Sequence, residues 1–253
     1  MKLQVVKIGG AALADAAWLS GFAAAVATAR TPLVIVHGGG PDITALSDRL
    51  GIEVRWHEGR RVTPPEALDV AAMVLSGRVN KRIVAALLAA GVDAIGLSGV
   101  DGGLLRADIV ENGQLGRVGR VASVRTGLMT GLLHQGHTIV VSPISLGSDG
   151  EPLNVNADDA AAAIAAALGA TELVFLTDVP GVRDASGVRR LLDAGEAVSL
   201  IRTGIAFGGM SVKLSAAMNA LDCGVNAVRI GDAQVLFDTS AGTVLRPVSL
   251  GVA

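Results

Sequence analysis

Two glycine clusters follow two short apolar runs near the start of the chain. The first reads Val5-Val6-Lys7-Ile8-Gly9-Gly10 and the second reads Val36-His37-Gly38-Gly39-Gly40. Because glycine has no Cβ, the backbone N–H groups of such loops can approach a ligand closely. A lysine in an apolar strand is costly unless its ammonium group reaches solvent or an anion. The two clusters therefore predict a phosphate-binding site with Lys7 directed into it.

Neither cluster matches a common nucleotide-binding motif. The P-loop pattern Gly-x-x-x-x-Gly-Lys-[Ser/Thr] is absent from the sequence, and Ile43 stands where the dinucleotide-binding fingerprint requires its third glycine. This disfavours a dinucleotide-dependent oxidoreductase. A tight turn between a strand and a helix explains either cluster taken alone, but two such loops after successive strands favour anion binding.

A third motif places three polar side chains at alternate positions, in Leu153-Asn154-Val155-Asn156-Ala157-Asp158. In an extended segment such positions share one face, so Asn154, Asn156 and Asp158 can point into one cleft. The competing interpretation is a polar turn with a helix N-cap at Asp158. A calcium-binding EF-hand is excluded, because Asp159 stands where that loop requires glycine.

Two further motifs lie in the second half of the chain. Gly208-Gly209-Met210-Ser211-Val212-Lys213 opens a helical pattern, and a lysine one turn inside can reach a phosphate at the helix N-terminus. Leu176-Thr177-Asp178-Val179-Pro180-Gly181-Val182 ends an apolar strand with polar residues, at the sheet edge where α/β proteins bind ligands. A solvated surface lysine and an ordinary turn are the alternatives.

Strands and helices alternate along the whole chain around these motifs. The runs that predict strands are Gln4–Ile8, Leu33–His37, Ala94–Leu97, Thr138–Ser142, Leu173–Leu176 and Ala227–Ile230. The helical patterns are Ala12–Arg30, Asp42–Leu50, Pro65–Ala90, Val124–Gln135, Asp158–Leu168 and Gly209–Cys223. Short apolar strands between amphipathic helices predict an α/β fold whose mainly parallel sheet is covered on both faces.

Two segments interrupt this alternation and predict β-hairpins. They are Glu53–Thr63 and Leu104–Val121, and Asn112-Gly113 in the second predicts a type I′ turn. We expect these hairpins to cover the carboxyl edge of the sheet. No linker divides the chain, so we expect one domain over residues 1–253, with an N-terminal half to about Gly147 and a C-terminal half beyond it.

Composition limits the classes of partner and compartment. The formal net charge is −2 over 253 residues, which does not favour nucleic acid or anionic membranes as partners. The longest apolar stretch, Ala160–Ala170, is too short to span a bilayer. The single cysteine, Cys223, forms no internal disulfide and fits a reducing compartment, so we expect a cytoplasmic protein. Cys223 is predicted to lie in the core, and His37 to be a packing or hydrogen-bonding residue.

Taken in order, these motifs resemble those of the amino acid kinase family. Gly59-Arg60-Arg61-Val62-Thr63 extends the match, which covers essentially the whole chain. Within the family, the sequence is most similar to enzymes that use ATP to phosphorylate the side-chain carboxylate of N-acetyl-L-glutamate in arginine biosynthesis. The resemblance implies a three-layer αβα sandwich, with an open, mainly parallel central sheet and inserted β-hairpins. It also implies a homodimer, with acyl amino acid binding and dimerisation in the N-terminal half and ATP binding in the C-terminal half.

The resemblance implies roles for individual residues. Lys7 and Lys213 would contact the transferring phosphoryl group, and Asp158 would hold the two ammonium groups. The residues implied in binding the acidic substrate are Gly39, Gly40, Arg61, Asn154 and Asn156, with Arg61 as a clamp on the second carboxylate. The residues implied in binding the nucleotide are Gly9, Gly10, Thr177, Asp178, Val182, Gly209 and Met210. Mg²⁺ would be bound through the ATP phosphates, and no metal ligand from the protein is expected.

Two alternatives remain open. One is the related kinase that phosphorylates aminoadipate or glutamate attached to an acidic amino-group carrier protein, which would need a basic docking surface. Arg60, Arg61, Arg78 and Arg82 are candidates for that surface, whereas Arg61-Val62-Thr63 favours a free substrate. The other is a non-catalytic sensor of nucleotides or amino acids with the same fold.

The sequence departs from the family pattern in three places, which affect the predicted substrate, oligomeric state and regulation. Glu58 and Arg60 replace the residues usual beside the clamp, which bears on the identity of the substrate. The chain also begins almost at its first strand, so we expect a dimer without the inhibition by arginine that an N-terminal helix accompanies in relatives.

Overall fold

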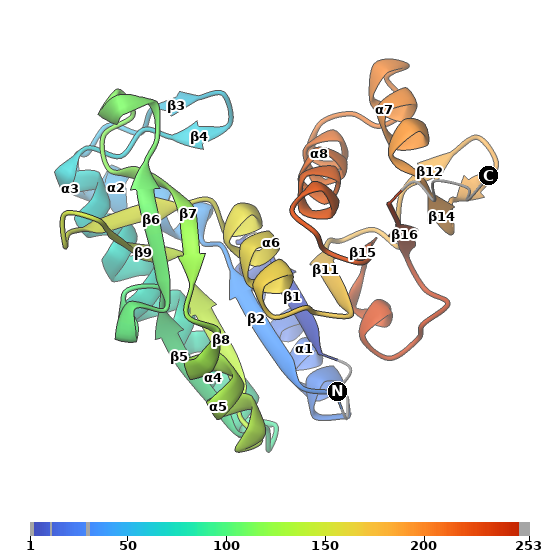
Figure 1. Cartoon of the computed structure of the whole chain (residues 1–253), viewed down its shortest axis with the longest axis horizontal. Coiled ribbons are helices and arrows are strands. Elements are labelled where there is room, and N and C mark those ends of the chain that lie inside the picture. The colour runs from blue at the N-terminus through green and yellow to red at the C-terminus, as the bar shows by residue number, and fades with distance from the viewer. Residues whose placement is uncertain (1–2, 11, 29–30, 248–253) are drawn as a thin grey trace.

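The computed structural model describes residues 3–10, 12–28 and 31–247, and its centre is one large β-sheet (Figure 1). The strands of this sheet are β1 (Gln4–Ile8), β2 (Leu33–His37), β5 (Ala94–Ser98), β8 (Thr138–Ser142), β11 (Glu172–Leu176), β14 (Leu191–Leu192), β15 (Val228–Gly231) and β16 (Thr243–Leu245). Their order is β14-β16-β15-β11-β1-β2-β8-β5. The strands from β15 to β5 run parallel, and β16 pairs antiparallel with β15.

The predicted parallel strands are confirmed, and each lies within one or two residues of its expected position. Every residue of β2, β8 and β11 is buried, as expected for a parallel sheet covered on both faces. The sequence analysis missed β14 and β16, which are only 2 and 3 residues long. Such short strands carry too few side chains for a recognisable pattern.

Helices cover both faces of the sheet and form the outer two of three layers. They are α1 (Ala16–Thr28), α2 (Gly40–Leu50), α3 (Pro65–Ala72), α4 (Asn80–Ala89), α5 (Thr126–His134), α6 (Ala157–Ala167), α7 (Ala194–Arg202) and α8 (Gly209–Asp222). Val5 packs with residues of α5, α6 and α8, whereas its neighbour Val6 packs in the cluster that holds residues of α1 and α4. The alternation along β1 thus feeds two separate cores. None of the described helices is long and apolar enough to cross a membrane.

Two predicted helices differ from the structure. The pattern from Ala12 begins with a 3₁₀ turn, and α1 starts only after Asp15, whose carboxylate accepts a hydrogen bond from the Ala17 N–H at 2.8 Å. Arg30, the predicted end of this helix, lies outside the described residues. The pattern Pro65–Ala90 is interrupted by a π-helical segment, Met73–Val79, between α3 and α4. A π segment inside a helix is frequent at functional sites.

A small closed barrel packs beside the large sheet. Its strands are β6 (Leu105–Ile109), β7 (Val118–Val124), β9 (Ile144–Gly147) and β10 (Pro152–Val155). Strands β6 and β7 form the predicted antiparallel pair. Asn112 and Gly113 both have positive φ, as a type I′ turn requires, but the chain runs on to Arg117 before β7 begins. The hairpin predicted within Glu53–Thr63 is formed by β3 (Trp56–His57) and β4 (Arg60–Arg61).

The expected division of the chain near Gly147 stays a prediction. Strands β9 and β10 pair antiparallel and belong to the same barrel, so Gly147 lies within this barrel. After Val155 the chain leaves the barrel and enters α6. In Figure 1 the barrel and the β3–β4 hairpin lie on one side of the molecule and α7 and α8 on the other.

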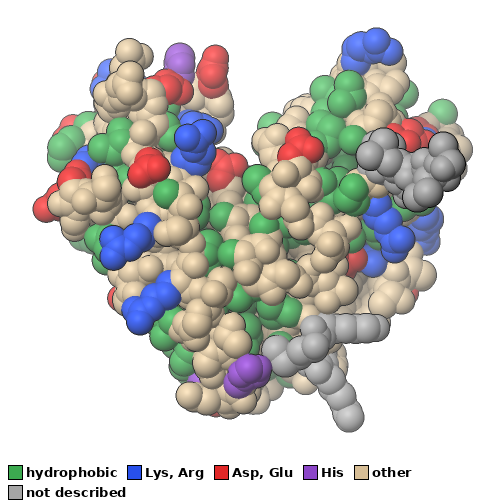
Figure 2. Space-filling model, in the orientation of Figure 1, with side chains coloured by type: hydrophobic (Ala, Val, Ile, Leu, Met, Phe, Trp, Pro, Cys, Tyr) green, Lys and Arg blue, Asp and Glu red, His purple; other side chains and the backbone are tan. Residues whose placement is uncertain are grey.

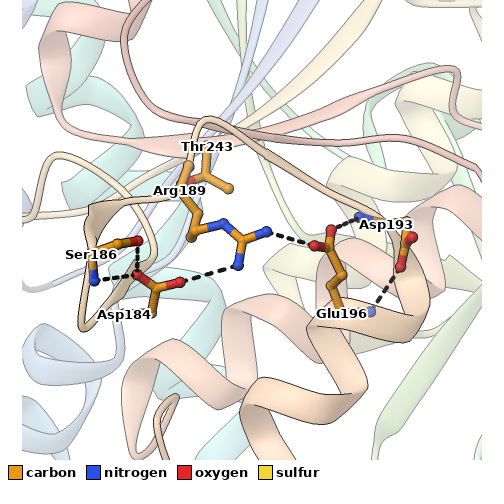
Figure 3. Close-up of polar contacts among 6 residues, drawn as sticks. All are labelled: Asp184, Ser186, Arg189, Asp193, Glu196 and Thr243. Carbon is orange, nitrogen blue, oxygen red and sulfur yellow. Dashed lines mark hydrogen bonds and ion pairs between the residues drawn. The ribbon is translucent and has the colours of Figure 1, made fainter.

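The C-terminal half contains a polar network that the sequence analysis did not anticipate (Figure 3). Arg189 donates hydrogen bonds to Asp184 at 3.1 Å and to Glu196 at 2.5 Å. Glu196 and Asp193 also form a capping box at the start of α7. The network therefore ties the hairpin of β12 (Arg183–Asp184) and β13 (Gly187–Val188) to α7.

Candidate active site

Two cavities lie at the carboxyl ends of the parallel strands, and Lys7 lines both of them. The smaller cavity, about 310 Å³, is lined by Gly10, by the second glycine cluster, by the β3–β4 hairpin and by residues around β10. The larger cavity, about 750 Å³, is lined by Gly9, Thr177, Asp178 and Lys213, among others. Figure 2 shows a deep notch between the two halves of the molecule. Lys7 therefore stands where two ligands could meet.

The two glycine clusters pack directly against each other. Strands β1 and β2 are adjacent, and a Cβ added to Gly10 would lie 2.9 Å from the Gly39 Cα and from the Gly40 nitrogen. A Cβ on Gly39 would lie 2.6 Å from Leu75, in the π-helical segment. Among the described residues, the N–H groups of Gly10, Gly39 and Gly40 donate to no backbone carbonyl. They are therefore available to an anion.

Lys7 is paired with Asp158 across the sheet edge. The Lys7 Nζ lies 2.8 Å from Asp158 Oδ1, and the two side chains are 16% and 19% exposed. Asp158 lies in the first turn of α6, but the N-cap is Asn156, whose Oδ1 accepts a hydrogen bond from the Asp158 N–H at 2.7 Å. The possibility that Asp158 caps this helix is thus wrong, and its carboxylate is left to hold Lys7.

Lys213 reaches the same region from the first turns of α8 and has no such partner. Among the described residues, no carboxylate forms an ion pair with its ammonium group. Burial lowers the pKa of Lys213, and the charge of Lys7 lowers it further, while Asp158 and Asp178 favour its charged form. Two cations therefore line the larger cavity close enough to repel each other, and the Asp158 carboxylate favours the charged form of Lys213 while it pairs with Lys7.

Arg61 lies inside the smaller cavity and is only 8% exposed. Its Nη2 donates hydrogen bonds to the Gly40 carbonyl at 3.2 Å and to Thr44 Oγ1 at 2.8 Å. Its guanidinium carbon lies 4.6 Å from the centre of the Trp56 ring. Arg60 also lines the cavity but is more exposed, and it lies 4.0 Å from Asp159.

Asn154 lines the smaller cavity and is linked to Arg61 through Thr63. The Asn154 Nδ2 donates to Thr63 Oγ1 at 3.1 Å, and the Thr63 hydroxyl donates to the Arg61 carbonyl at 2.7 Å. Asn156 lines the same cavity. The structure therefore brings Gly39, Gly40, Arg61, Asn154 and Asn156 to one cavity, as the sequence analysis expected of them.

His37 is hydrogen-bonded to the second glycine cluster. The buried ring donates from Nδ1 to the Gly38 carbonyl at 2.9 Å, so its Nε2 accepts from Asn80 Nδ2 at 3.3 Å. Burial lowers the pKa of His37 to about 4. The predicted role of His37 as a hydrogen-bonding residue is confirmed. The prediction for Cys223 is wrong, because it is exposed at the end of α8.

The residues expected around a nucleotide are only partly brought together. Gly9, Thr177 and Asp178 line the larger cavity, whereas Gly10 lines the smaller one. Val182 lines neither cavity, because its side chain is buried in the core and its N–H donates to Thr243 Oγ1 at 2.8 Å. Gly209 and Met210 begin α8 without lining either cavity, and Met210 packs against the core.

Several lining residues were missed from the sequence. Trp18, Asp232, Gln234 and Phe237 line the larger cavity, and Trp56 lines the smaller one. The chain has only two tryptophans, and both line a cavity. In a chain so poor in aromatic residues, the two tryptophans were a signal that could have been used.

Comparisons with known proteins agree with this arrangement. The sequence model of the Amino acid kinase family matches residues 2–232. The chain is 49% identical over 236 residues to the acetylglutamate kinase of Roseiflexus sp. (strain RS-1), covering 92% of this chain and 90% of that protein. It is 41% identical over 251 residues to the acetylglutamate kinase of Geobacillus kaustophilus (strain HTA426), covering 97% and 96%.

Solved structures show the same fold. The protein smu.665 from Streptococcus mutans UA159 superposes with a TM-score of 0.81 at 28% identity, covering 97% of this chain and 99% of that one. The N-acetylglutamate synthase from Neisseria gonorrhoeae complexed with coenzyme A and N-acetyl-glutamate superposes with a TM-score of 0.82 at 26% identity, covering 97% of this chain and 59% of that one. Sequence, fold and site geometry agree, and the chain belongs to the amino acid kinase family.

Proposed function

We propose that this protein transfers the terminal phosphoryl group of ATP to the side-chain carboxylate of N-acetyl-L-glutamate, giving N-acetylglutamyl 5-phosphate for arginine biosynthesis. The observation that carries the proposal is the Lys7–Asp158 pair, 2.8 Å apart, at the junction of two cavities. The smaller cavity would hold the acidic substrate and the larger would hold ATP. Relatives that are 41% and 49% identical carry the name acetylglutamate kinase, which supports the same activity.

The chemistry needs no general base. A carboxylate is ionised at neutral pH and is itself the nucleophile, so the protein has to position two anions that repel each other and to neutralise the phosphoryl oxygens. Lys7 and Lys213 would supply positive charge, and the free N–H groups of Gly10, Gly39 and Gly40 would supply hydrogen bonds. Asp158 would keep the ammonium group of Lys7 aimed at the junction.

Different residues would bind the two substrates. Arg61 would bind the carboxylate that does not react, with Asn154 and Asn156 along the acyl amino acid. Asp178 would lie along the nucleotide in the larger cavity, where the Thr177 hydroxyl donates to its carboxylate at 3.0 Å. Mg²⁺ would enter with ATP, bound through its phosphates. Roles for Val182, Gly209 and Met210 at the nucleotide remain part of the proposal.

The carrier-linked alternative is less well supported by the arginines. Arg61 is buried in the smaller cavity, and Arg78 and Arg82 lie 3.7 and 3.2 Å from Asp42. Of the three that lie near a carboxylate, Arg60 has the longest separation, 4.0 Å from Asp159, and is the most available to an acidic protein. A non-catalytic sensor is also disfavoured, because Lys7, Lys213 and Asp158 are all present, with Lys7 paired to Asp158 and Lys213 influenced by both charges. A homodimer and a cytoplasmic location stay predictions.

A hydroxamate-trapped assay with ATP and Mg²⁺ tests the proposal. The purified protein is given N-acetyl-L-glutamate, L-glutamate or carrier-linked aminoadipate in parallel. We expect acyl phosphate from N-acetyl-L-glutamate alone, formed about 10²- to 10³-fold more slowly by the variant Lys213→Ala purified in the same way. Product from the carrier-linked substrate alone would establish the alternative kinase, and no product from any substrate would favour the sensor.

A further inference from the structure

The Arg61 side chain is held from three directions before any substrate is considered. Its Nη2 donates to the Gly40 carbonyl and to Thr44 Oγ1, both in α2, and its guanidinium stacks on Trp56. Trp56 and Arg61 are also directly opposite each other in the β3–β4 pair. A long side chain loses much rotamer freedom when it is fixed. Three simultaneous contacts therefore specify one position for this guanidinium.

The positive charge of Arg61 has no counter-ion among the residues that the structure describes. Among the described residues, no carboxylate forms an ion pair with it, and burial lowers its pKa against the weaker opposing influence of Asp48. Only Nη2 donates to described residues, so Nε and Nη1 are left for a ligand. A buried cation with free donors is stabilised by a carboxylate that enters the cavity.

The same contacts tie Arg61 to the glycine clusters. Gly40 offers its carbonyl to Arg61, and its nitrogen lies 2.9 Å from the place where a Gly10 Cβ would be. Arg61 and the N–H groups proposed to bind the reacting carboxylate are therefore held at a fixed distance from each other. This distance would set the separation at which the two carboxylates of a dicarboxylic substrate are bound.

We propose that Thr44 and Trp56 are positioning residues, which fix the Arg61 guanidinium at a set distance from the glycine clusters and so select the chain length of the dicarboxylic substrate. This inference rests on the proposed function. Neither residue needs to touch the substrate for this role, since each acts through Arg61.

The test compares Thr44→Val, Thr44→Ser and Trp56→Leu with the unmodified protein. Thr203→Val is a matched control, because its hydroxyl bonds to the Ser199 carbonyl on α7, away from both cavities. The hydroxamate assay is run with N-acetyl-L-glutamate and with N-acetyl-L-aspartate, which is one methylene shorter. Steady-state constants for each acid and for ATP are measured, together with the melting temperature.

We expect Thr44→Val to raise the KM for N-acetyl-L-glutamate about tenfold, the usual effect of losing one hydrogen bond to a charged group. The preference in kcat/KM for N-acetyl-L-glutamate over N-acetyl-L-aspartate should fall by a comparable factor, because a loosened Arg61 can follow the shorter acid. The kcat and the KM for ATP should stay within about twofold, and Thr44→Ser should restore the KM. Trp56→Leu should raise the same KM about threefold through loss of the cation–π contact.

The outcomes separate this inference from the function on which it rests. If the unmodified protein forms no acyl phosphate from N-acetyl-L-glutamate, the proposed function fails and the inference fails with it. If that protein is active and both variants keep the KM and the chain-length preference, only the inference fails. Equal losses with both acids and with ATP would show a merely structural role and would also overturn it. If Thr44→Val does not fold, the KM and the chain-length preference of Trp56→Leu, in the exposed hairpin, decide the test.

Discussion

The two cavities that meet at Lys7 are built in different ways. In the smaller cavity two of the polar side chains already bind neighbouring groups: Arg61 donates to Gly40 and Thr44, and Asn154 donates to Thr63. In the larger cavity Lys213 has no carboxylate partner among the described residues, and Phe237 is 60% exposed. The smaller cavity measures about 310 Å³ and the larger about 750 Å³.

This difference indicates which of the two cavities is preorganised for its ligand. The smaller cavity is lined by residues from β1, the glycine loop after β2, α2, the hairpin and the small barrel, so the packing of the N-terminal half fixes its shape. The larger cavity lies between the start of α1 and the segment after β15, and its lining residues include the exposed Phe237. We infer that the fold preorganises the side for the acidic substrate, whereas the nucleotide itself completes the other side.

The largest effects are expected at the two lysines. Lys7→Ala and Lys213→Ala should each lower kcat about 10²- to 10³-fold, the usual loss when one charge-stabilising donor is removed. Their effects on stability should differ. Lys7→Ala leaves Asp158 without its partner and should lower the melting temperature, whereas Lys213→Ala removes a cation repelled by Lys7 and should not. Near-normal turnover in either variant would contradict the proposed charge clamp.

The contact between the glycine clusters provides the next test. In Gly10→Ala, the new Cβ would lie 2.9 Å from the backbone of Gly39 and Gly40, so the two loops must separate. A displacement of about 1 Å at reacting groups can cost about 10²-fold in rate, and we expect kcat/KM to fall by this order. Gly21→Ala in α1, whose Cβ would meet nothing within 4 Å, is the control. Unchanged kinetics in Gly10→Ala would show that the smaller cavity is not rigid.

The buried His37 makes the N-terminal half sensitive to acid. Its pKa is about 4 in the folded protein against 6.5 ordinarily, so between these values the unfolded chain binds a proton that the folded chain does not. The contribution of neutral His37 to the free energy of unfolding is therefore complete above about pH 6.5. It is lost as the pH falls towards 4, and the free energy of unfolding decreases by about 3 kcal/mol in all. Chemical denaturation at several pH values measures it, with His37→Gln as the comparison. If the free energy of unfolding depends on pH equally in the unmodified protein and in His37→Gln, the result would contradict a buried neutral histidine.

The smallest of these effects should be at Arg61. Arg61→Ala should raise the KM for N-acetyl-L-glutamate about 10- to 100-fold, since it removes charge-assisted hydrogen bonds to one carboxylate. The KM for ATP should stay close to that of the unmodified protein, because Arg61 lines only the smaller cavity. An equal rise in both KM values would show that the two cavities do not bind separate substrates.

Local patterns were sufficient to predict the elements that carry the site. The parallel strands, the glycine clusters and the β3–β4 hairpin depend on apolar runs and glycines that are close in sequence. The π-helical segment Met73–Val79 was not predicted, because its sequence continues the helical pattern on both sides. Its position makes sense only in three dimensions, where Leu75 and Val79 pack on Gly39.

The sequence by itself determined which residue types are present for chemistry: two lysines, one aspartate and two glycine clusters, in an order typical of one family. Only the tertiary structure decided how they are partnered. It pairs Lys7 with Asp158, leaves Lys213 without a described carboxylate partner, buries Val182 and exposes Cys223. The physical reason is that partners such as Lys7 and Asp158 are brought together by the packing of separate strands and helices, and no local periodicity encodes that contact.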